Sequence, residues 1–265
     1  MKNSQTHPYQ RFEQVGIEVA REAGRYLMSR FRQPLAVAHK GEVDLVTEVD
    51  IAAEKMILAR LSGEFPSHTF MAEEQHPETR SGNYRWIIDP LDGTTNYAHG
   101  LPAFAVSLGL EVDGRVRWGV VYDPCQEEMF LARQGGGAWL NGRQITVSKQ
   151  TDLGVSLLAT GFPYDIRTSS RNNLDHFHSF ALRALAIRRI GSAALDLCYL
   201  AAGRFDGFWE LSLHAWDCAA GYLIVREAGG KVSNFSGEEG SIYDQECVAS
   251  NSLIHQQMLD VIRGR

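Results

Sequence analysis

The chain has 265 residues, of which 44% are hydrophobic and 22% are charged. These values are typical of a folded globular protein and exclude a disordered chain, a collagen-like repeat and a disulfide-dense miniprotein. The formal net charge of −6 argues against a broad nucleic-acid-binding face. No run approaches the roughly 20 apolar residues that span a bilayer. Residues 1–11 are polar and lack an apolar signal core, so we expect a cytoplasmic protein without membrane contacts.

The four cysteines are Cys125, Cys198, Cys218 and Cys247. Each lies in an apolar or mixed run, and no two form a C-x-x-C pair. The spacing predicts buried free thiols in a reducing compartment and argues against a zinc site.

Two helices are expected near the start of the chain. Apolar residues recur at helical spacing over residues 12–27 and predict an amphipathic helix. Thr47 is suited to cap a second helix, with Asp50 three residues later, as in a capping box.

An antiparallel meander is predicted next. The dipeptides Asp113-Gly114 and Asn141-Gly142 are typical of tight hairpin turns. Strands are expected at residues 84–89, 103–112, 116–122, 129–132, 138–140 and 144–147.

The second half of the chain alternates between strands and helices. Strands are expected at residues 157–160, 205–210 and 246–249, and helices at 172–185, 193–201, 216–227 and the C-terminus. This grouping predicts stacked layers rather than a doubly wound sheet. Because no repeat or linker divides the chain, we expect a single unit over residues 1–265, with two lobes at about 1–150 and about 151–265.

The most informative segment is DPLDGTTN, residues 89–96, directly after an apolar run. We expect the strand to end at Asp89, because Pro90 cannot continue the ladder. Asp89, Asp92 and the Leu91 carbonyl would then form an all-oxygen cup of the kind that Mg²⁺ prefers. A helix opening after Gly93 would present backbone N–H groups to a phosphate. The alternative interpretation is an ordinary turn, since Asp-Pro-x-Asp-Gly is favourable turn chemistry.

Carboxylates elsewhere in the chain strengthen the metal interpretation. Glu73-Glu74 follows another apolar run, Asp217 lies at the start of an expected helix, and Asp50 follows the Thr47 cap. Taken singly, these have ordinary structural interpretations: a solvated acidic loop, a helix N-cap and a capping box, respectively. Their joint occurrence in this order is the specific signal.

The chain resembles the inositol monophosphatases, within the lithium-sensitive, magnesium-dependent phosphatase superfamily. The resemblance runs through most of the sequence. Its motifs are VDLVT at 43–47 with Asp50, Glu73-Glu74, WIIDPLDGTTN at 86–96, IGSAA at 190–194, Glu210 with Trp216-Asp217, and EAGG at 227–230.

The resemblance implies an α/β (α+β) layered sandwich of alternating helical and sheet layers, usually a homodimer, that holds two or three Mg²⁺ ions. Glu73, Asp89 and the Leu91 carbonyl would bind the first ion. Asp89, Asp92 and Asp217 would bind the second. A third, weaker ion would depend on Glu73, which is therefore also expected to take part in catalysis.

The resemblance also implies roles toward water and substrate. Thr94 and Asp50 would orient and deprotonate the attacking water, and the N–H groups of Gly93 and Thr94 would contact the phosphate. The residues implied in contacts to the alcohol part of the substrate are Ala193, Glu210 and Asp92.

The implied activity is Mg²⁺-dependent hydrolysis of inositol 1-phosphate to inositol and phosphate by in-line attack of water, inhibited by lithium. The alternatives are the same chemistry on fructose 1,6-bisphosphate or histidinol phosphate, and a family member with an added binding or regulatory role. Relatives acting on nucleotide 3′-phosphates commonly carry Lys where this chain has Thr95. No nucleic-acid partner is indicated.

Two positions depart from the family pattern. Ser212 stands where members commonly carry Gly, which puts the wall of the substrate pocket in question. The Lys40-Gly41-Glu42 stretch is one residue shorter than in animal members, which puts the third ion in question.

Overall fold

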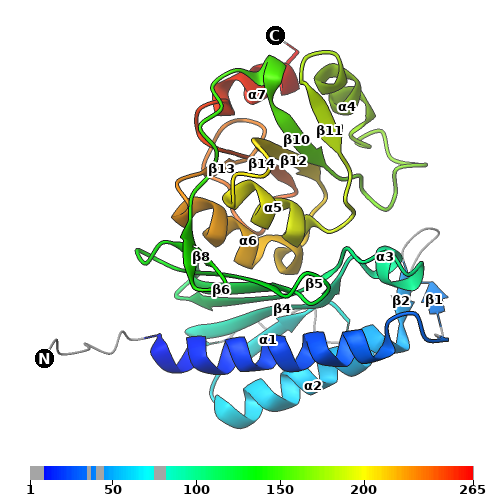
Figure 1. Ribbon diagram of the computed structural model, residues 1–265, viewed down its shortest axis with the longest axis vertical. Coiled ribbons are helices and arrows are strands. Elements are labelled where there is room, and N and C mark those ends of the chain that lie inside the picture. The colour runs from blue at the N-terminus through cyan, green and yellow to red at the C-terminus, as the bar shows by residue number, and fades with distance from the viewer. Residues whose placement is uncertain (1–8, 35–36, 40–44, 75–81, 265) are drawn as a thin grey trace, which may run out of the picture.

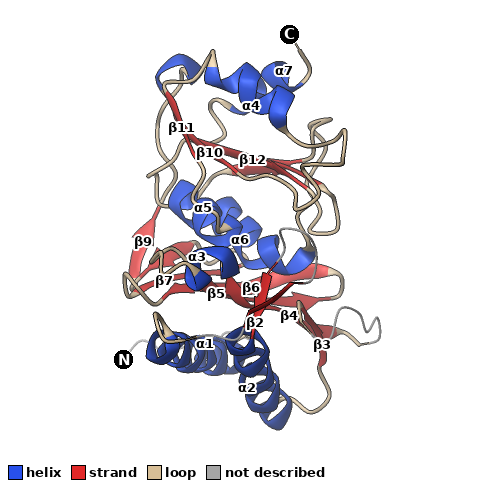
Figure 2. Ribbon diagram, turned by 90° about the vertical axis from the view of Figure 1, so that its right-hand side faces the viewer, coloured by secondary structure: helices blue, strands red, loops and turns tan. Residues whose placement is uncertain are grey.

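The computed structural model describes residues 9–34, 37–39, 45–74 and 82–264. Helical and sheet layers alternate along its long axis (Figures 1 and 2). Two sheets, one of seven strands and one of five, are separated by a pair of helices and covered on their outer faces by two further pairs. The helices are α1 (Gln10–Arg30), α2 (Glu48–Glu64), α3 (Thr94–Ala98), α4 (Leu174–Ala181), α5 (Ala193–Ala201), α6 (Ala215–Glu227) and α7 (His255–Ile262). The expected layered α/β sandwich is confirmed.

The seven-stranded sheet contains the predicted meander, β4 to β9 in chain order, with β3 added parallel to β4. At both hairpin turns the central residues have left-handed backbones, with φ of 51° and 75° at Asp113 and Gly114 and of 48° and 77° at Asn141 and Gly142. This geometry matches the strand twist, as the sequence predicted. The strands are β3 (Thr69–Ala72), β4 (Tyr84–Asp92), β5 (Ala105–Val112), β6 (Arg115–Asp123), β7 (Glu128–Arg133), β8 (Ala138–Leu140) and β9 (Arg143–Ile145).

The predicted end of the central strand at Asp89 is wrong. β4 continues through Pro90 to Asp92, which pairs with Ala105 of β5. The register shifts between Asp89 and Asp92. Such an irregularity lets a residue without an N–H group sit inside a strand without breaking the ladder on either side.

The five-stranded sheet is mixed, in the order β11-β10-β12-β14-β13. β10 runs parallel to both of its neighbours, and β14 is antiparallel to β12 and β13. The helix predicted over residues 172–185 is too long, because the chain after α4 turns to enter edge strand β11. The strands are β10 (Leu157–Thr160), β11 (Ala186–Arg188), β12 (Gly207–Leu211), β13 (Lys231–Ser233) and β14 (Glu246–Ser250).

Three small elements complete the fold. They are the antiparallel pair β1 (Val37–His39) and β2 (Leu45–Thr47), and a 3₁₀ turn at Leu153–Val155. In the described residues, no helix combines the length and the apolar character needed to cross a membrane.

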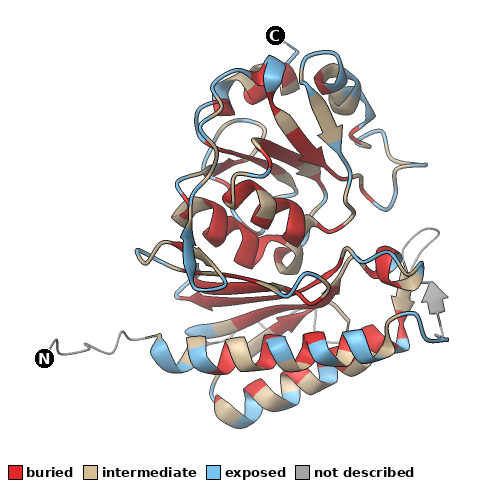
Figure 3. Cartoon of the chain, viewed as in Figure 1, coloured by how far each residue is buried: buried red, intermediate tan, exposed pale blue. Residues whose placement is uncertain are grey.

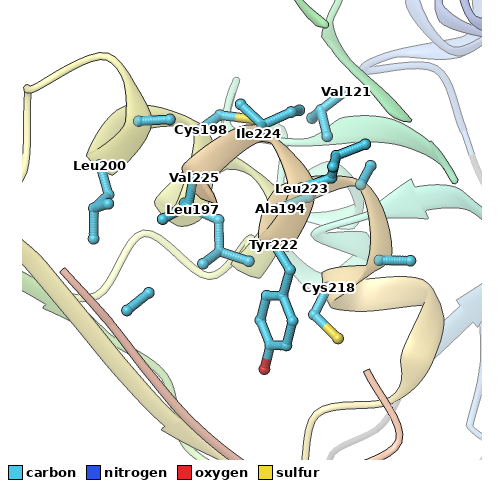
Figure 4. Close-up of a cluster of buried hydrophobic side chains, with 14 of the residues drawn as sticks. Val121, Ala194, Leu197, Cys198, Leu200, Cys218, Tyr222, Leu223, Ile224 and Val225 are labelled. Atoms are coloured by element: carbon cyan, nitrogen blue, oxygen red, sulfur yellow. The ribbon is translucent and has the colours of Figure 1, made fainter. Parts of the chain in front are cut away.

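The α5–α6 pair fills the space between the two sheets and is buried along most of its length (Figure 3). Side chains such as Leu197 and Tyr222 form one apolar cluster with the facing strands (Figure 4). A Cβ placed on Gly119 of β6 would lie 2.8 Å from the Cα of Ala220, so only glycine allows α6 this close to the sheet. Each fully buried Leu or Ile here stabilises the fold by roughly 1.5–3 kcal/mol.

The other face of the seven-stranded sheet packs against α1 and α2 through a second apolar cluster. The cysteine prediction is confirmed for Cys198, Cys218 and Cys247, which are buried free thiols, whereas Cys125 is half-buried.

Candidate active site

The site begins where β4 ends. Gly93 has a φ of 94°, in the left-handed region, and a Cβ there would lie 2.9 Å from the Ala103 carbonyl oxygen. Only glycine fits this turn without strain. α3 starts directly after it at Thr94, as the sequence predicted, so the first N–H groups of a helical turn open beside Asp89 and Asp92.

Strand register brings Glu73 next to Asp89. β3 and β4 are parallel, with Ala72 opposite Ile88, so the following residues leave the two strands side by side. Asp89 is 1% exposed, and its Oδ1 accepts a hydrogen bond of 2.9 Å from the Leu91 N–H. Burial, followed by the negative charges of Glu73, Asp92 and Asp217, raises the pKa of Asp89 well above its ordinary value.

Asp92 connects this strand end to α5. Its Oδ2 accepts hydrogen bonds from Ser192 Oγ at 2.5 Å and from the Ala194 N–H at 2.7 Å. Burial raises the pKa of Asp92 to about 6, although these hydrogen bonds lower it. Ser192 also caps α5 by accepting from the Leu195 N–H, so one hydroxyl both caps the helix and orients the carboxylate.

Asp217 lies in the first turn of α6, and its Oδ2 accepts a hydrogen bond of 2.7 Å from the His214 N–H. The N-cap interpretation of Asp217 is wrong, because His214 is the N-cap and Asp217 caps the helix from three residues further on. Burial, then the charge of Asp92 and more weakly that of Glu73, raise the pKa of this carboxylate well above its ordinary value. Asp217 therefore lies within electrostatic reach of both residues. Capping and membership of the acidic group are compatible.

Asp50 contacts the start of α3 through Thr94. The predicted capping box with Thr47 is confirmed, and Thr47 donates to Oδ2 through both its N–H and its hydroxyl. The other oxygen, Oδ1, accepts a hydrogen bond of 2.8 Å from Thr94 Oγ1. Burial raises the pKa of Asp50. Two residues 44 positions apart, on α2 and α3, thus form one buried hydroxyl–carboxylate pair.

A cavity of about 270 Å³ opens beside these carboxylates. Its lining includes the acidic residues Glu73, Asp92 and Asp217 together with Ala193 and Glu210. Burial and the charge of Asp92 raise the pKa of Glu210 to about 8 against the opposing effect of Arg189. Five of the sequence-predicted residues, from both halves of the chain, therefore line one cavity. The predicted residues outside its lining are Asp50, Asp89, Leu91, Gly93 and Thr94.

Two residues of this site were missed from the sequence. Asp196 is 1% exposed and lines the cavity, yet its Oδ1 accepts no hydrogen bond from any described residue. The sequence did contain a signal for Asp196, because this residue is the single carboxylate within the otherwise apolar α5. Asn96 was quoted only as part of a motif, but its Nδ2 donates to the carbonyls of Ala103 at 2.7 Å and Ile190 at 2.9 Å, tying α3 to the approach of α5.

Of the two departures from the family pattern, the structure describes only Ser212. Ser212 has a φ of 63°, in the left-handed region, which explains why glycine is common at this position. The residues Lys40, Gly41 and Glu42, and Asp44 of the early motif, lie outside the described residues.

Replacing this serine should stabilise the protein. We expect Ser212→Gly to raise the free energy of unfolding by about 1 kcal/mol, because glycine removes the left-handed strain. Thermal unfolding of both proteins measures the difference. Ser212→Ala is the control, since it keeps the Cβ, and an equal gain from alanine would contradict a backbone origin.

The carboxylates fit a hard cation by their chemistry. Within the described ranges, no three Asp, Glu, His or Cys side chains already have the spacing of a formed metal centre. Nevertheless the charge of Asp92 raises the pKa of both Asp89, which is buried, and Asp217, which is partly buried. Such a group is unfavourable unless a cation or protons neutralise it. An all-oxygen donor set of this kind suits Mg²⁺.

Comparison with known proteins defines the class. A family model described as "Inositol monophosphatase family" matches residues 9–263. The chain belongs to the inositol monophosphatase family.

The relatives carry two kinds of name. An inositol-1-monophosphatase of Mesorhizobium japonicum is 42% identical over 252 residues, covering 94% of this chain and 95% of the relative. A protein of Pseudomonas aeruginosa named Nus factor SuhB is 43% identical over 258 residues, covering 94% of each chain. The solved structure of an inositol monophosphatase from Anabaena (Nostoc) is 39% identical, with a TM-score of 0.87 and 96% of each chain covered.

Proposed function

We propose that this protein is a Mg²⁺-dependent phosphomonoesterase that hydrolyses inositol 1-phosphate to inositol and phosphate. The observation that carries the proposal is an acidic group beside one cavity: Glu73, Asp92 and Asp217 line the cavity, and Asp89 lies in electrostatic contact with all three. The Gly93–Thr94 helix start follows Asp92 directly. Family membership supports phosphatase chemistry. The inositol 1-phosphate specificity is proposed from the family resemblance.

The residues that would hold the metal are those named from the resemblance. One Mg²⁺ would be bound by Glu73, Asp89 and the Leu91 carbonyl. A second would be bound by Asp89, Asp92 and Asp217. Glu73 would also contribute to a weaker third ion. When bound, Mg²⁺ would stabilise the charge on the transferring phosphoryl group and lower the pKa of water. Phosphate monoesters hydrolyse extremely slowly unaided, and enzymes accelerate the reaction by up to ~10²¹-fold. Strong stabilisation of the phosphoryl charge is therefore required.

Thr94 and Asp50 would orient and deprotonate the attacking water. A water molecule that donates its hydrogen bond to Thr94 Oγ1 can pass a proton through the hydroxyl to Asp50 Oδ1, 2.8 Å away. The raised pKa of Asp50 makes this carboxylate a better proton acceptor than an ordinary aspartate. The N–H groups of Gly93 and Thr94 would hold the phosphate, as helix starts do.

Ala193, Glu210 and Asp92 would contact the alcohol. A polyol presents several hydroxyl groups, and carboxyl groups at the cavity wall are suitable partners for them. Glu210 lies directly over Gly161, where a Cβ would fall 1.9 Å from its Oε1. The absence of a side chain at residue 161 therefore leaves room for Glu210 at the pocket wall.

The test is phosphate release with Mg²⁺ from inositol 1-phosphate, fructose 1,6-bisphosphate, histidinol phosphate and a nucleotide 3′-phosphate. Asp92→Asn controls for contaminating phosphatases. Preference for inositol 1-phosphate supports the proposal. Preference for another ester would support the phosphatase reaction and contradict the proposed substrate. Folded protein that binds Mg²⁺ but releases no phosphate would contradict the proposal and favour a binding or regulatory role.

The remaining properties are proposed from the resemblance alone. The enzyme would act in the cytoplasm as a homodimer and would be inhibited by lithium. Light scattering of the purified protein and phosphate release with added LiCl check the last two.

Glu210→Gln should separate substrate recognition from metal binding. We expect a rise of about tenfold or more in KM for inositol 1-phosphate, because the amide replaces one acceptor by a donor at a pocket wall. Mg²⁺ affinity should change less than twofold, since this residue is not a proposed ligand. Initial rates and calorimetric Mg²⁺ titration measure the two quantities. Equal losses in both would argue against the separation.

Metal-free protein should lose stability as the pH rises. Folded Asp92 and Glu210 have pKa values of about 6 and about 8, above the unfolded values near 4. The folded state therefore binds more protons than the unfolded chain between about pH 4 and pH 8, so stability falls across that window.

We expect Tm to fall by about 5 °C or more over this window without metal. Mg²⁺ should reduce the fall, because the cation favours the charged carboxylates. Scanning calorimetry at several pH values, with Mg²⁺ or with a chelator, makes the comparison. A fall unaffected by Mg²⁺ would show that these carboxylates do not face a bound cation.

A further inference from the structure

A second buried carboxylate lies on α2, one helical turn after Asp50. Glu54 is 0% exposed and shares a helix face with Asp50, since residues four apart lie above one another. Its Oε2 accepts a hydrogen bond of 2.7 Å from the backbone N–H of Glu74. The resemblance assigns no role to Glu54, and the mechanism proposed above does not use it.

This hydrogen bond acts on the segment that carries Glu73. Residues 73 and 74 follow the end of β3, where the ladder with β4 stops at Ala72. Beyond this point the sheet no longer fixes the backbone. The Glu54 carboxylate holds the peptide N–H immediately after Glu73, at the place where Glu73 lies beside Asp89.

α2 therefore contacts the site at two points. Through Asp50 it contacts Thr94, and through Glu54 it holds the Glu73-Glu74 backbone. Both contacts come from one face of a single 17-residue helix. A carboxylate buried to this extent is costly unless its hydrogen bonds are made, so the contact to Glu74 N–H is also a constraint on where Glu54 can lie.

We propose that Glu54 is a positioning residue, which sets the Mg²⁺ affinity of the site by holding the backbone that carries Glu73. This inference rests on the proposed function in one respect, the assignment of Glu73 as a metal ligand. Groups that orient metal ligands from behind commonly change affinity by 10–100-fold when they are removed.

The experiment is calorimetric titration of MgCl₂ into metal-free protein. Glu54→Leu has similar volume and no acceptor, whereas Glu54→Gln keeps an oxygen that can accept from Glu74 N–H. We expect Mg²⁺ binding at one or more sites to weaken by about tenfold or more in the leucine variant. In the glutamine variant it should stay within about threefold of the unmodified protein.

Ser233→Ala is the matched control for lost stability. Ser233 is fully buried in the five-stranded sheet and hydrogen-bonds to His255 Nε2 at 2.9 Å, away from the acidic cavity. It should lower Tm and leave Mg²⁺ affinity unchanged. If Glu54→Leu does not fold, Glu54→Asp replaces it, because the shorter acid keeps the charge and cannot reach the Glu74 N–H.

The outcomes separate this inference from the proposed function, because Mg²⁺ binding does not require turnover. Unmodified protein that binds Mg²⁺ and shows the expected variant pattern supports the role of Glu54, even if no phosphate is released from any ester. Leucine and aspartate variants that bind Mg²⁺ as tightly as the unmodified protein would overturn it. Failure of the unmodified protein to bind Mg²⁺ would overturn it as well.

Discussion

Asp92→Asn should lower phosphate release from inositol 1-phosphate by about 10³-fold or more while the protein stays folded. The loss is expected because the amide removes the negative charge proposed to bind Mg²⁺ beside the leaving oxygen. The fold is expected to survive because the asparagine side-chain oxygen can still accept from Ser192 Oγ and the Ala194 N–H. Rates at saturating substrate and thermal unfolding of the same preparations measure both effects.

The metal-free variant provides an internal check. The charge of Asp92 raises the pKa of Asp89, Glu210 and Asp217, so removing it should raise Tm without metal and reduce the gain on adding Mg²⁺. Asp92→Ala is the comparison, since it also deletes the acceptor for α5 and should be less stable than the asparagine variant. Near-normal turnover in folded Asp92→Asn protein would show that Asp92 has no catalytic role.

Thr94→Val is expected to have the second largest effect, lowering kcat by about 10²–10⁴-fold. Valine has nearly the shape of threonine but cannot relay a proton from water to Asp50. Mg²⁺ affinity should stay within about threefold, because the proposed ligands remain in place. Steady-state rates give kcat, and calorimetric titration gives the affinity.

Thr94→Ser is the control that keeps the hydroxyl. We expect its kcat to stay within about tenfold of the unmodified enzyme. If serine loses as much activity as valine, the methyl group and its packing matter more than the hydroxyl. The proposed water-handling role of Thr94 would then be wrong.

Local signals in the sequence predicted much of the fold. The Thr47–Asp50 capping box, both hairpins and the helix start after Gly93 are all present. These features depend on a few neighbouring residues, so their chemistry is visible in the chain itself. Strand β10 and helix α5 were predicted to the residue for the same reason.

The errors arose where distant segments decide the structure. Pro90 is a strand terminator by its own chemistry, but the pairing of Asp92 with Ala105 continues the ladder beyond it. Strand β11 exists because β10 offers it a parallel edge, which no local pattern shows. In each case tertiary pairing outweighed local preference.

The candidate site shows the same division. Motif spacing brought forward Glu73, Asp89, Asp92 and Asp217, and the structure places them around one cavity or in electrostatic contact. Asp196 and Glu54 were not predicted, because a carboxylate on a helix is ordinarily a surface group. Their importance depends on burial and on partners far away in the chain.

The position of the α5–α6 pair has a consequence for biosynthesis. Ile145 completes the seven-stranded sheet, but the helices that cover its inner face end at Glu227. At about 5–20 residues per second, a ribosome needs roughly 4–16 s to make the 82 residues from 146 to 227. Until α6 has been made, the nascent chain carries an incompletely covered apolar sheet face. A chain truncated before Glu227 should therefore be retained by chaperones or degraded.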